Sequence, residues 1–178
     1  MMSMFIKGFK GICEKLILIL ALLMYPSFNF SQVYHIDNEE DISRVILDDE
    51  YIIISKFETG TGKFISTIGG YYEPGEFLNL NEDVFDVKLE FNSNYDQDSI
   101  KSLSIVKTSK WKNISKENNT LKGKWVMSGR YNNGEFRTRN SDLPRKTMKV
   151  LIDGFFQWIA FNTETFKFSG SGGGEYET

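Results

Sequence analysis

The feature that most constrains the fold of this chain is an internal repeat. Val45–Tyr51 aligns with Val150–Phe156 at an offset of 105 residues, which places Asp48 on Asp153. At an offset of 104 residues, further positions recur in the same order: Lys63-Phe64 as Lys167-Phe168, Gly69-Gly70 as Gly173-Gly174, and Tyr72 as Tyr176. Because apolar, Asp, Gly-Gly and Tyr positions recur in one order, we expect two copies of one structural unit.

The pattern inside each unit predicts antiparallel strands joined by short turns. Asn133-Gly134 and Asp153-Gly154 stand between strand-like runs, and such dipeptides favour two-residue hairpins because both positions accept a positive φ. In Val87–Phe91 apolar and polar side chains alternate, as a strand with one buried face requires. No sustained helical period follows residue 31. The sequence therefore predicts an all-β fold of antiparallel meanders.

The N-terminal segment has the order of a secretory signal peptide. Three lysines within the first fifteen residues precede the apolar run Leu16–Tyr25, and the polar stretch Ser27–Gln32 follows. We expect cleavage after Ser31 and a secreted or periplasmic product in the cell envelope. Ten apolar residues are too few to span a bilayer as a helix, but an uncleaved membrane anchor through Phe5–Tyr25 is the alternative.

Removal of residues 1–31 leaves 147 of the 178 residues. We expect a first unit over 32–113, a linker over 114–120 and a second unit over 121–178. The 147 residues carry 18 basic and 23 acidic side chains, a net charge of −5, which argues against nucleic-acid binding. They contain no cysteine, so the exported part must be stabilised by its apolar core rather than by disulfides.

Three stretches of the second unit resemble a known family. They are Leu121–Trp125 with its Gly-x-Trp, Arg145–Val150, and Phe156–Tyr176. They are similar to a family of bacterial exported proteins known only as membrane or secreted proteins, whose members carry two tandem lipocalin-like units. The resemblance implies two lipocalin-like β-barrels in the envelope and implies no activity.

Two departures from that family pattern carry expectations of their own. Tyr34-His35-Ile36 stands where the first unit should have Gly-x-Trp, so that strand is expected to be degenerate. The first unit continues past its Gly-Gly-Tyr stretch with three strand-like runs, which are Phe77–Leu80, Asp86–Phe91 and Ser102–Trp111. The second unit stops at Thr178, soon after the matching stretch. We therefore expect the second barrel to be incomplete, as in a truncated gene product.

No set of residues suited to catalysis is evident. His35 is the single histidine and is interpreted as a surface residue, so neither a metal site nor a nucleophile–base pair can be assembled. Asp37–Asp41 lacks the spacing of a calcium loop, and Asp48-Asp49-Glu50 lies at a turn. Gly60–Lys63 lacks the flanking residues of a phosphate loop. We expect no catalytic residues, metal or cofactor, and no enzymatic activity.

One basic segment stands out in this acidic chain. Between Lys122 and Lys149 there are eight basic and two acidic residues. Arg137, Arg139 and Arg145 are candidates for an anion or acidic-glycan site, because guanidinium groups bind carboxylates and phosphates bidentately. A solvated hairpin is the alternative interpretation.

Aromatic side chains are the second candidate group. Trp125, Phe156 and Trp158 are the tentative ligand-binding aromatics, and further rings lie close in sequence: Trp111, Phe155 and Phe161. All six rings are predicted to fill the core, as side chains do in small barrels, and the alternative is that they line a ligand cavity.

Two functions from different classes remain. The first is a non-enzymatic lipocalin-like binder of a small apolar or anionic molecule, and a cavity of roughly 300 Å³ or more would favour it. The second is an envelope interaction or structural protein without a small-molecule ligand, which docks onto an envelope protein and would show an exposed apolar patch. The strands are short and lack an outward apolar band, so no transmembrane barrel is expected. The sequence predicts no oligomeric state.

Overall fold

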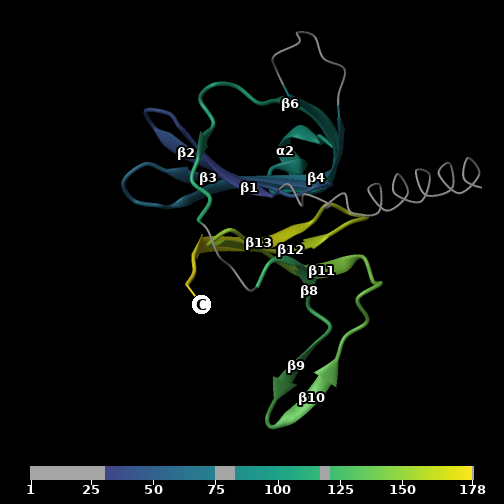
Figure 1. The fold of residues 1–178 in the computed structure, drawn as a ribbon. Helices are drawn as coiled ribbons and strands as arrows, with labels where there is room; N and C mark the ends of the chain where they lie inside the picture. The colour runs from purple at the N-terminus through teal and green to yellow at the C-terminus, as the bar shows by residue number, and fades with distance from the viewer. Residues whose placement is uncertain (1–30, 75–82, 117–120, 178) are drawn as a thin grey trace, which may run out of the picture.

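The computed structural model describes residues 31–74, 83–116 and 121–177. Residues 1–30 of the predicted signal peptide and the predicted strand Phe77–Leu80 lie outside these residues. The described chain is nearly all-β, and its strands pair in antiparallel fashion in three sheets (Figure 1). The predicted fold class is confirmed at this level.

The first sheet is a meander of seven strands in the order β6-β5-β4-β3-β2-β1-β7. A single helical turn, α2 (Tyr95–Asp98), joins its fifth and sixth strands. The strands are β1 (Gln32–Asp37), β2 (Asp41–Leu47), β3 (Tyr51–Glu58), β4 (Phe64–Pro74), β5 (Val84–Asn92), β6 (Ser102–Val106) and β7 (Lys112–Asn113).

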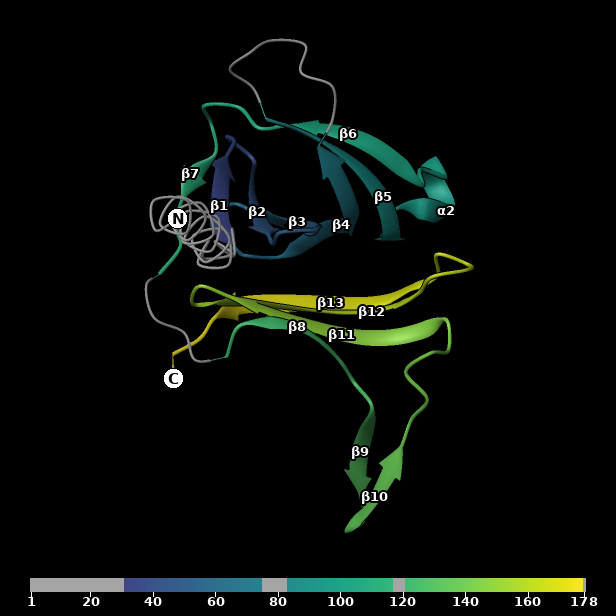
Figure 2. The ribbon, with the colours of Figure 1, turned by 45° about the vertical axis from the view of Figure 1, so that its right-hand side comes forward.

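The first sheet curls strongly but does not close into a barrel (Figure 2). Its two edge strands, β6 and β7, form no pair within the described residues, so the prediction of a closed lipocalin-like barrel is wrong there. Trp111, just before β7, packs against the core inside the curl. Its ring lies 5.4 Å from that of Tyr34 and 6.3 Å from that of Phe85.

The second part of the chain forms a smaller sheet and a separate hairpin. The sheet has the order β13-β12-β11-β8, and no barrel forms here either among the described residues. The hairpin β9–β10 projects away from both larger sheets (Figures 1 and 2). The strands are β8 (Gly123–Val126), β9 (Gly129–Asn132), β10 (Glu135–Thr138), β11 (Arg145–Ile152), β12 (Phe155–Asn162) and β13 (Phe168–Glu175).

Two layers of apolar side chains stabilise this arrangement. One layer lies inside the curl of the first sheet and includes Val45, Ile52 and Leu89. The other lies between the first sheet and the four-stranded sheet, which pack face to face in Figure 2. It includes residues from both halves of the chain: Val33, Ile46, Tyr51, Ile53, Phe91, Met148, Val150, Ile152, Phe155, Ile159 and Phe161. The two predicted units therefore share one core.

The predicted two-residue hairpins are confirmed by their backbone angles. Asp153 and Gly154 have φ values of 46° and 85°, and Asn133 and Gly134 have values of 53° and 82°. Both turns thus use the left-handed region that Asn, Asp and Gly accept at low cost.

A β-bulge in β5 corrects one expectation about the alternating strand Val87–Phe91. Gly69 pairs with Phe91 and Gly70 pairs with Leu89, which leaves Glu90 as an extra residue. An extra residue reverses the facing of the side chains beyond it. Leu89 therefore points into the curl, whereas Phe91 points between the two sheets.

Candidate functional site

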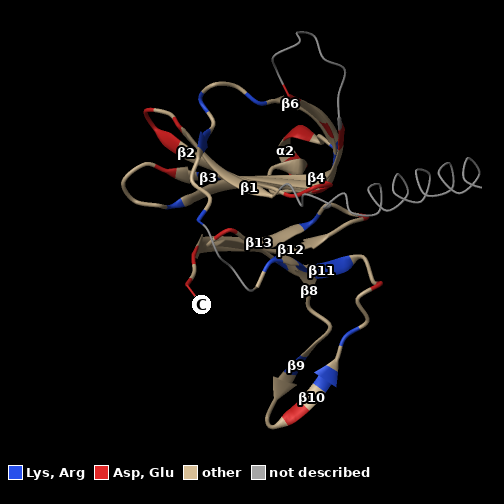
Figure 3. Ribbon diagram, in the orientation of Figure 1, with Lys and Arg blue, Asp and Glu red and all other residues tan. Residues whose placement is uncertain are grey.

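The three arginines singled out from the sequence line one hollow. This arginine hollow has a volume of about 510 Å³ and lies where the β9–β10 hairpin meets the approach to β11. A fourth arginine, Arg130, contributes to it, because Arg130 stands opposite Arg137 in the hairpin register. The lining residues are Met127, Gly129, Arg130, Arg137, Thr138, Arg139, Leu143 and Arg145. Figure 3 shows the blue of Lys and Arg on β10 and β11.

Arg139 connects the lining of the arginine hollow to β11 of the four-stranded sheet. Its Nη2 donates to the carbonyl oxygen of Arg145 at 2.5 Å, and its Nη1 donates to Thr147 Oγ1 at 3.4 Å. Its backbone N–H donates to the carbonyl oxygen of Ser128 at 2.6 Å. Arg139 thus joins the segment after β10 to the loop before β9 and to the start of β11.

The arginines of the hollow have no acidic partner. No carboxylate of the described residues lies within 4.0 Å of the Arg130, Arg137, Arg139 or Arg145 guanidinium groups. Like charges directly opposite each other in a sheet are destabilising, and Arg130 faces Arg137 in this way. A bound anion would relieve this repulsion.

The second group of candidates lies on the outer face of the four-stranded sheet. Trp125, Lys149 and Trp158 stand side by side in register across β8, β11 and β12. Trp125 is 56% exposed and Trp158 is 38% exposed. The Lys149 Nζ lies 5.6 Å from the centre of the Phe156 ring, on the same face. The sheet therefore presents two accessible indole rings with a cation between them.

Glycines of β13 make room for these rings. A Cβ atom on Gly172 would lie 2.6 Å from Trp158 Nε1, and one on Gly170 would lie 3.3 Å from the same indole. Gly174 faces Phe156 in the same way, at 3.5 Å. Alternate glycines of β13 therefore seat aromatic rings of the neighbouring strand β12.

The structure divides the six aromatic candidates. Phe155 and Phe161 are buried in the layer between the sheets, and Trp111 packs against the core of the curl. For these three, the core interpretation is confirmed. Trp125 and Trp158 lie on the surface, with the half-buried Phe156 beside them, and none of the three lines an enclosed barrel cavity.

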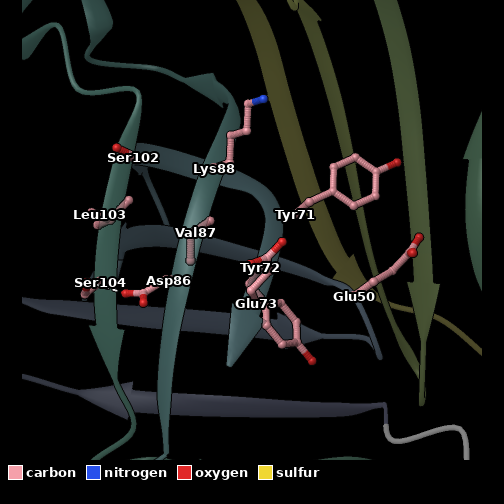
Figure 4. A pocket seen from close by; sticks show the side chains of 10 residues that line it. All are labelled: Glu50, Tyr71, Tyr72, Glu73, Asp86, Val87, Lys88, Ser102, Leu103 and Ser104. Atoms are coloured by element: carbon pink, nitrogen blue, oxygen red, sulfur yellow. Dashed lines mark hydrogen bonds between the residues drawn. The ribbon is translucent and has the colours of Figure 1, made fainter. Parts of the chain in front are cut away.

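A hollow of about 840 Å³ lies over β4, β5 and β6 (Figure 4). Its charged groups include Glu50, Glu73, Asp86 and Lys88. Two of its carboxylates already have partners, because Glu50 pairs with Lys124 at 3.5 Å and Asp86 accepts a hydrogen bond from Ser104. The remaining polar groups do not form a set in contact with one another.

Sequence reasoning missed one site, which lies around Arg44. His35, interpreted as a surface residue, is half-buried in β1 and accepts a hydrogen bond from Arg44 Nε at 3.4 Å. Arg44 has the same parity in β2 as Ile46, which belongs to the layer between the sheets. An arginine at an inward position of an apolar strand was the signal available in the sequence.

The two acidic clusters have local partners. In the first, Asp37 pairs with Lys112 at 2.7 Å and Asp41 pairs with Lys56 at 3.4 Å. In the second, Asp48 accepts the backbone N–H of Asp49 within the β2–β3 turn. In the described part of the chain, no three His, Cys, Asp or Glu side chains are grouped so as to hold a metal ion. No helix in the same residues is long and apolar enough to cross a membrane.

No family model matches the chain, and neither a curated protein nor a solved structure matches it.

Proposed function

We propose that this chain is an exported, non-enzymatic binding protein that holds an acidic oligosaccharide on its second sheet. The observation that supports this most directly is the arginine hollow. Four guanidinium groups line about 510 Å³ with no carboxylate partner among the described residues. Guanidinium groups bind carboxylates and sulfates through paired hydrogen bonds, so uronic or sulfated sugars fit this chemistry.

The aromatic face supplies the second component of the proposed site. Exposed indole rings such as Trp125 and Trp158 provide flat apolar surfaces against which the apolar face of a sugar ring packs. Thr147 of β11 connects this face to the hollow, because Arg139 donates to its hydroxyl group. An extended anionic chain would contact both the stacking surface and the arginines.

We also propose that the chain arose by duplication of one unit and that it is exported to the cell envelope. The meanders β2–β3–β4 and β11–β12–β13 share several local features, which support descent from one duplicated, lipocalin-like unit that no longer closes. Tyr72 N–H donates to the Glu50 carbonyl, and Tyr176 N–H donates to that of Gly154. The lysine-rich and apolar N-terminal segment supports export to the envelope, with cleavage after Ser31.

A binding experiment tests the proposal. Isothermal titration with a polyuronate oligosaccharide should show saturable binding, and a neutral oligosaccharide of equal length should bind far more weakly. The triple variant Arg137→Gln, Arg139→Gln, Arg145→Gln should lose at least about tenfold in affinity, because charge-assisted hydrogen bonds are removed.

A matched control removes equal charge elsewhere. The variant Lys63→Gln, Lys88→Gln, Lys110→Gln changes three exposed lysines of the first half of the chain and should leave the affinity unchanged. Equal loss in both variants would reduce the effect to overall charge. Tighter binding of single-stranded DNA than of the polyuronate would contradict the ligand class.

A second candidate function, docking onto an envelope protein, has its own observation. The β9–β10 hairpin projects into solvent with a pair of rings 5.2 Å apart, Tyr131 and Phe136, which are 77% and 54% exposed. Isolated two-stranded hairpins are marginally stable in water, so a partner that covers these rings would stabilise the hairpin. Tyr131→Ser with Phe136→Ser would abolish such docking and leave the polyuronate affinity intact.

A further inference from the structure

A third hollow, smaller than the two described above, lies between the first sheet and β13. It has a volume of about 320 Å³ and brings together residues from β1, β2, β3, the β3–β4 turn and β13. We name it the Arg44 pocket. The lining residues are His35, Ile42, Arg44, Phe57, Glu58, Gly60, Gly62 and Gly173.

The pocket surrounds a guanidinium group that is largely withdrawn from water. Arg44 Cζ lies 5.1 Å from the centre of the Phe155 ring and 5.7 Å from that of Phe57. Burial lowers the pKa of Arg44, an effect that the Glu175 carboxylate opposes. An arginine keeps its charge under such conditions, so the pocket holds a permanent cation.

In the described part of the chain this cation forms no ion pair. No carboxylate of the described residues lies within 4.0 Å of the Arg44 guanidinium. Of the nearby acids, Glu175 binds Lys116 at 2.5 Å, and Glu58 accepts the Thr61 hydroxyl at 2.6 Å. Buried charges in proteins are normally paired, because withdrawal from water is costly. Arg44 has five N–H donors and gives one of them, Nε–H, to His35.

The protonation state of His35, which lies against Arg44, depends on pH. Burial and the positive charge of Arg44 lower the pKa of His35, while Asp37 and Glu175 act in the opposite direction. The charged groups around the ring are thus Arg44 of β2, Asp37 of β1 and Glu175 of β13, with Glu58 of β3 in the same pocket. Lys112 of β7 stands opposite His35 in register and pairs with Asp37. A neutral ring is required for Nε2 to accept from Arg44.

We propose that the Arg44 pocket binds a small organic carboxylate. The carboxylate would take the free N–H donors of Arg44 in a paired arrangement, and the organic part would pack against Phe57 and Ile42. The volume of about 320 Å³ is near the lower end for small-molecule pockets, which restricts the ligand to a few heavy atoms. The Arg44 pocket shares no residue with the arginine hollow, so carboxylate binding here is independent of the proposed oligosaccharide binding there.

Binding at this site takes up protons. A carboxylate on Arg44 offsets the positive charge that disfavours protonated His35, so the pKa of His35 rises when the site is filled. By linkage, affinity for the carboxylate increases as the pH falls through the His35 pKa. Between about pH 5 and 8 His35 is the only side chain with an ordinary pKa in range, and the chain has one histidine.

The test uses benzoate as the probe and the single histidine as the reporter. With carbon-13 in the imidazole, the His35 signal should move saturably as benzoate is added, and its titration midpoint should rise. Acetate should bind more weakly because it lacks the apolar part. Arg44→Lys should weaken benzoate binding at least about tenfold, since a lysine offers no paired donors. The triple variant Arg137→Gln, Arg139→Gln, Arg145→Gln should bind benzoate normally.

Three outcomes would overturn the proposal. The first is a His35 signal that moves linearly with benzoate without saturation. The second is equal benzoate binding by Arg44→Lys. The third is phosphate binding as tightly as benzoate, which would show that the apolar wall contributes nothing. The His35 titration of the unsubstituted protein needs no variant, so it decides the question even where Arg44→Lys does not fold.

Discussion

At the scale of single residues, the layer between the sheets contains two buried side chains with polar groups, Gln157 and Tyr51. Gln157 is fully buried, and its Oε1 meets no donor among the described residues, although its Nε2 donates to Ser171 Oγ at 2.6 Å. Tyr51 is buried with its hydroxyl group bonded to Glu90 Oε2 at 2.9 Å. One group lacks a partner and the other has one, so their replacement should act in opposite directions.

Gln157→Met should stabilise the protein. Methionine matches the length of glutamine and removes an unsatisfied buried acceptor, which is worth about 1 kcal/mol. Ser171 keeps its bond to the Trp158 carbonyl at 2.8 Å. Urea denaturation measures the difference. Gln157→Glu is the control and should destabilise, since it buries a carboxylate. A less stable methionine variant would show that the amide is satisfied in solution.

The free energy of unfolding should fall at alkaline pH because Tyr51 loses its proton in the unfolded chain. Burial and the Glu90 carboxylate raise the pKa of Tyr51 well above its ordinary value of 10.0. Below pH 10 Tyr51 is protonated in both states, and its contribution is complete. Above pH 10 the unfolded chain loses the proton first, so stability falls by about 1.4 kcal/mol per pH unit. In Tyr51→Phe this fall should be smaller when denaturation curves are compared at pH 9 to about 11, and Tyr72 and Tyr176, whose pKa values are also raised, account for the remainder. Parallel pH profiles would contradict the assignment.

At the scale of strands, the matched Gly-Gly steps of β4 and β13 have different surroundings. A Cβ on Gly70 would lie 2.0 Å from the Lys88 carbonyl oxygen, because β5 pairs closely with β4. The nearest atom to a Cβ on Gly174 is Phe156 Cε1, at 3.5 Å. Among the described residues no strand pairs with the outer edge of β13. The second glycine of the step is thus sterically required in β4 and replaceable in β13.

Gly70→Ala should destabilise the protein by about 1–3 kcal/mol, because backbone atoms of β5 must move to admit the methyl group. Gly174→Ala should change stability by less than about 1 kcal/mol, since it meets only ordinary contacts. Thermal or urea denaturation of the two variants gives the comparison. Equal destabilisation by both would mean that β13 has a close neighbour on its outer edge.

At the scale of the whole molecule, the two halves are joined by a shared apolar layer. The Phe91 ring of β5 lies 5.1 Å from the Phe161 ring of β12. Each ring is almost fully buried, and each belongs to a different predicted unit. The two halves should therefore unfold together rather than as independent domains.

A double-mutant cycle measures this connection. Phe91→Ala and Phe161→Ala should each cost about 3–5 kcal/mol. Because the rings touch, the double variant should deviate from additivity by about 0.5–3 kcal/mol. Phe85→Ala with Phe161→Ala is the control, since Phe85 belongs to the core of the curl, and it should be additive. Additivity in the first cycle would mean that the sheets are energetically separate.

Local patterns alone determined much of this protein. The alternation of Val87–Phe91 predicted a strand, and Asn133-Gly134 and Asp153-Gly154 predicted hairpins, because these signals depend only on neighbouring residues. The grouping of Arg137, Arg139 and Arg145 was also foreseen, since they lie close together along the chain. Whether sheets close is decided by long-range packing, which also brings Trp111 against Tyr34 and Phe85 inside the curl. The burial of Arg44, the bulge at Glu90 and the seating of Trp158 over Gly172 also require contacts between distant strands, which no local pattern records.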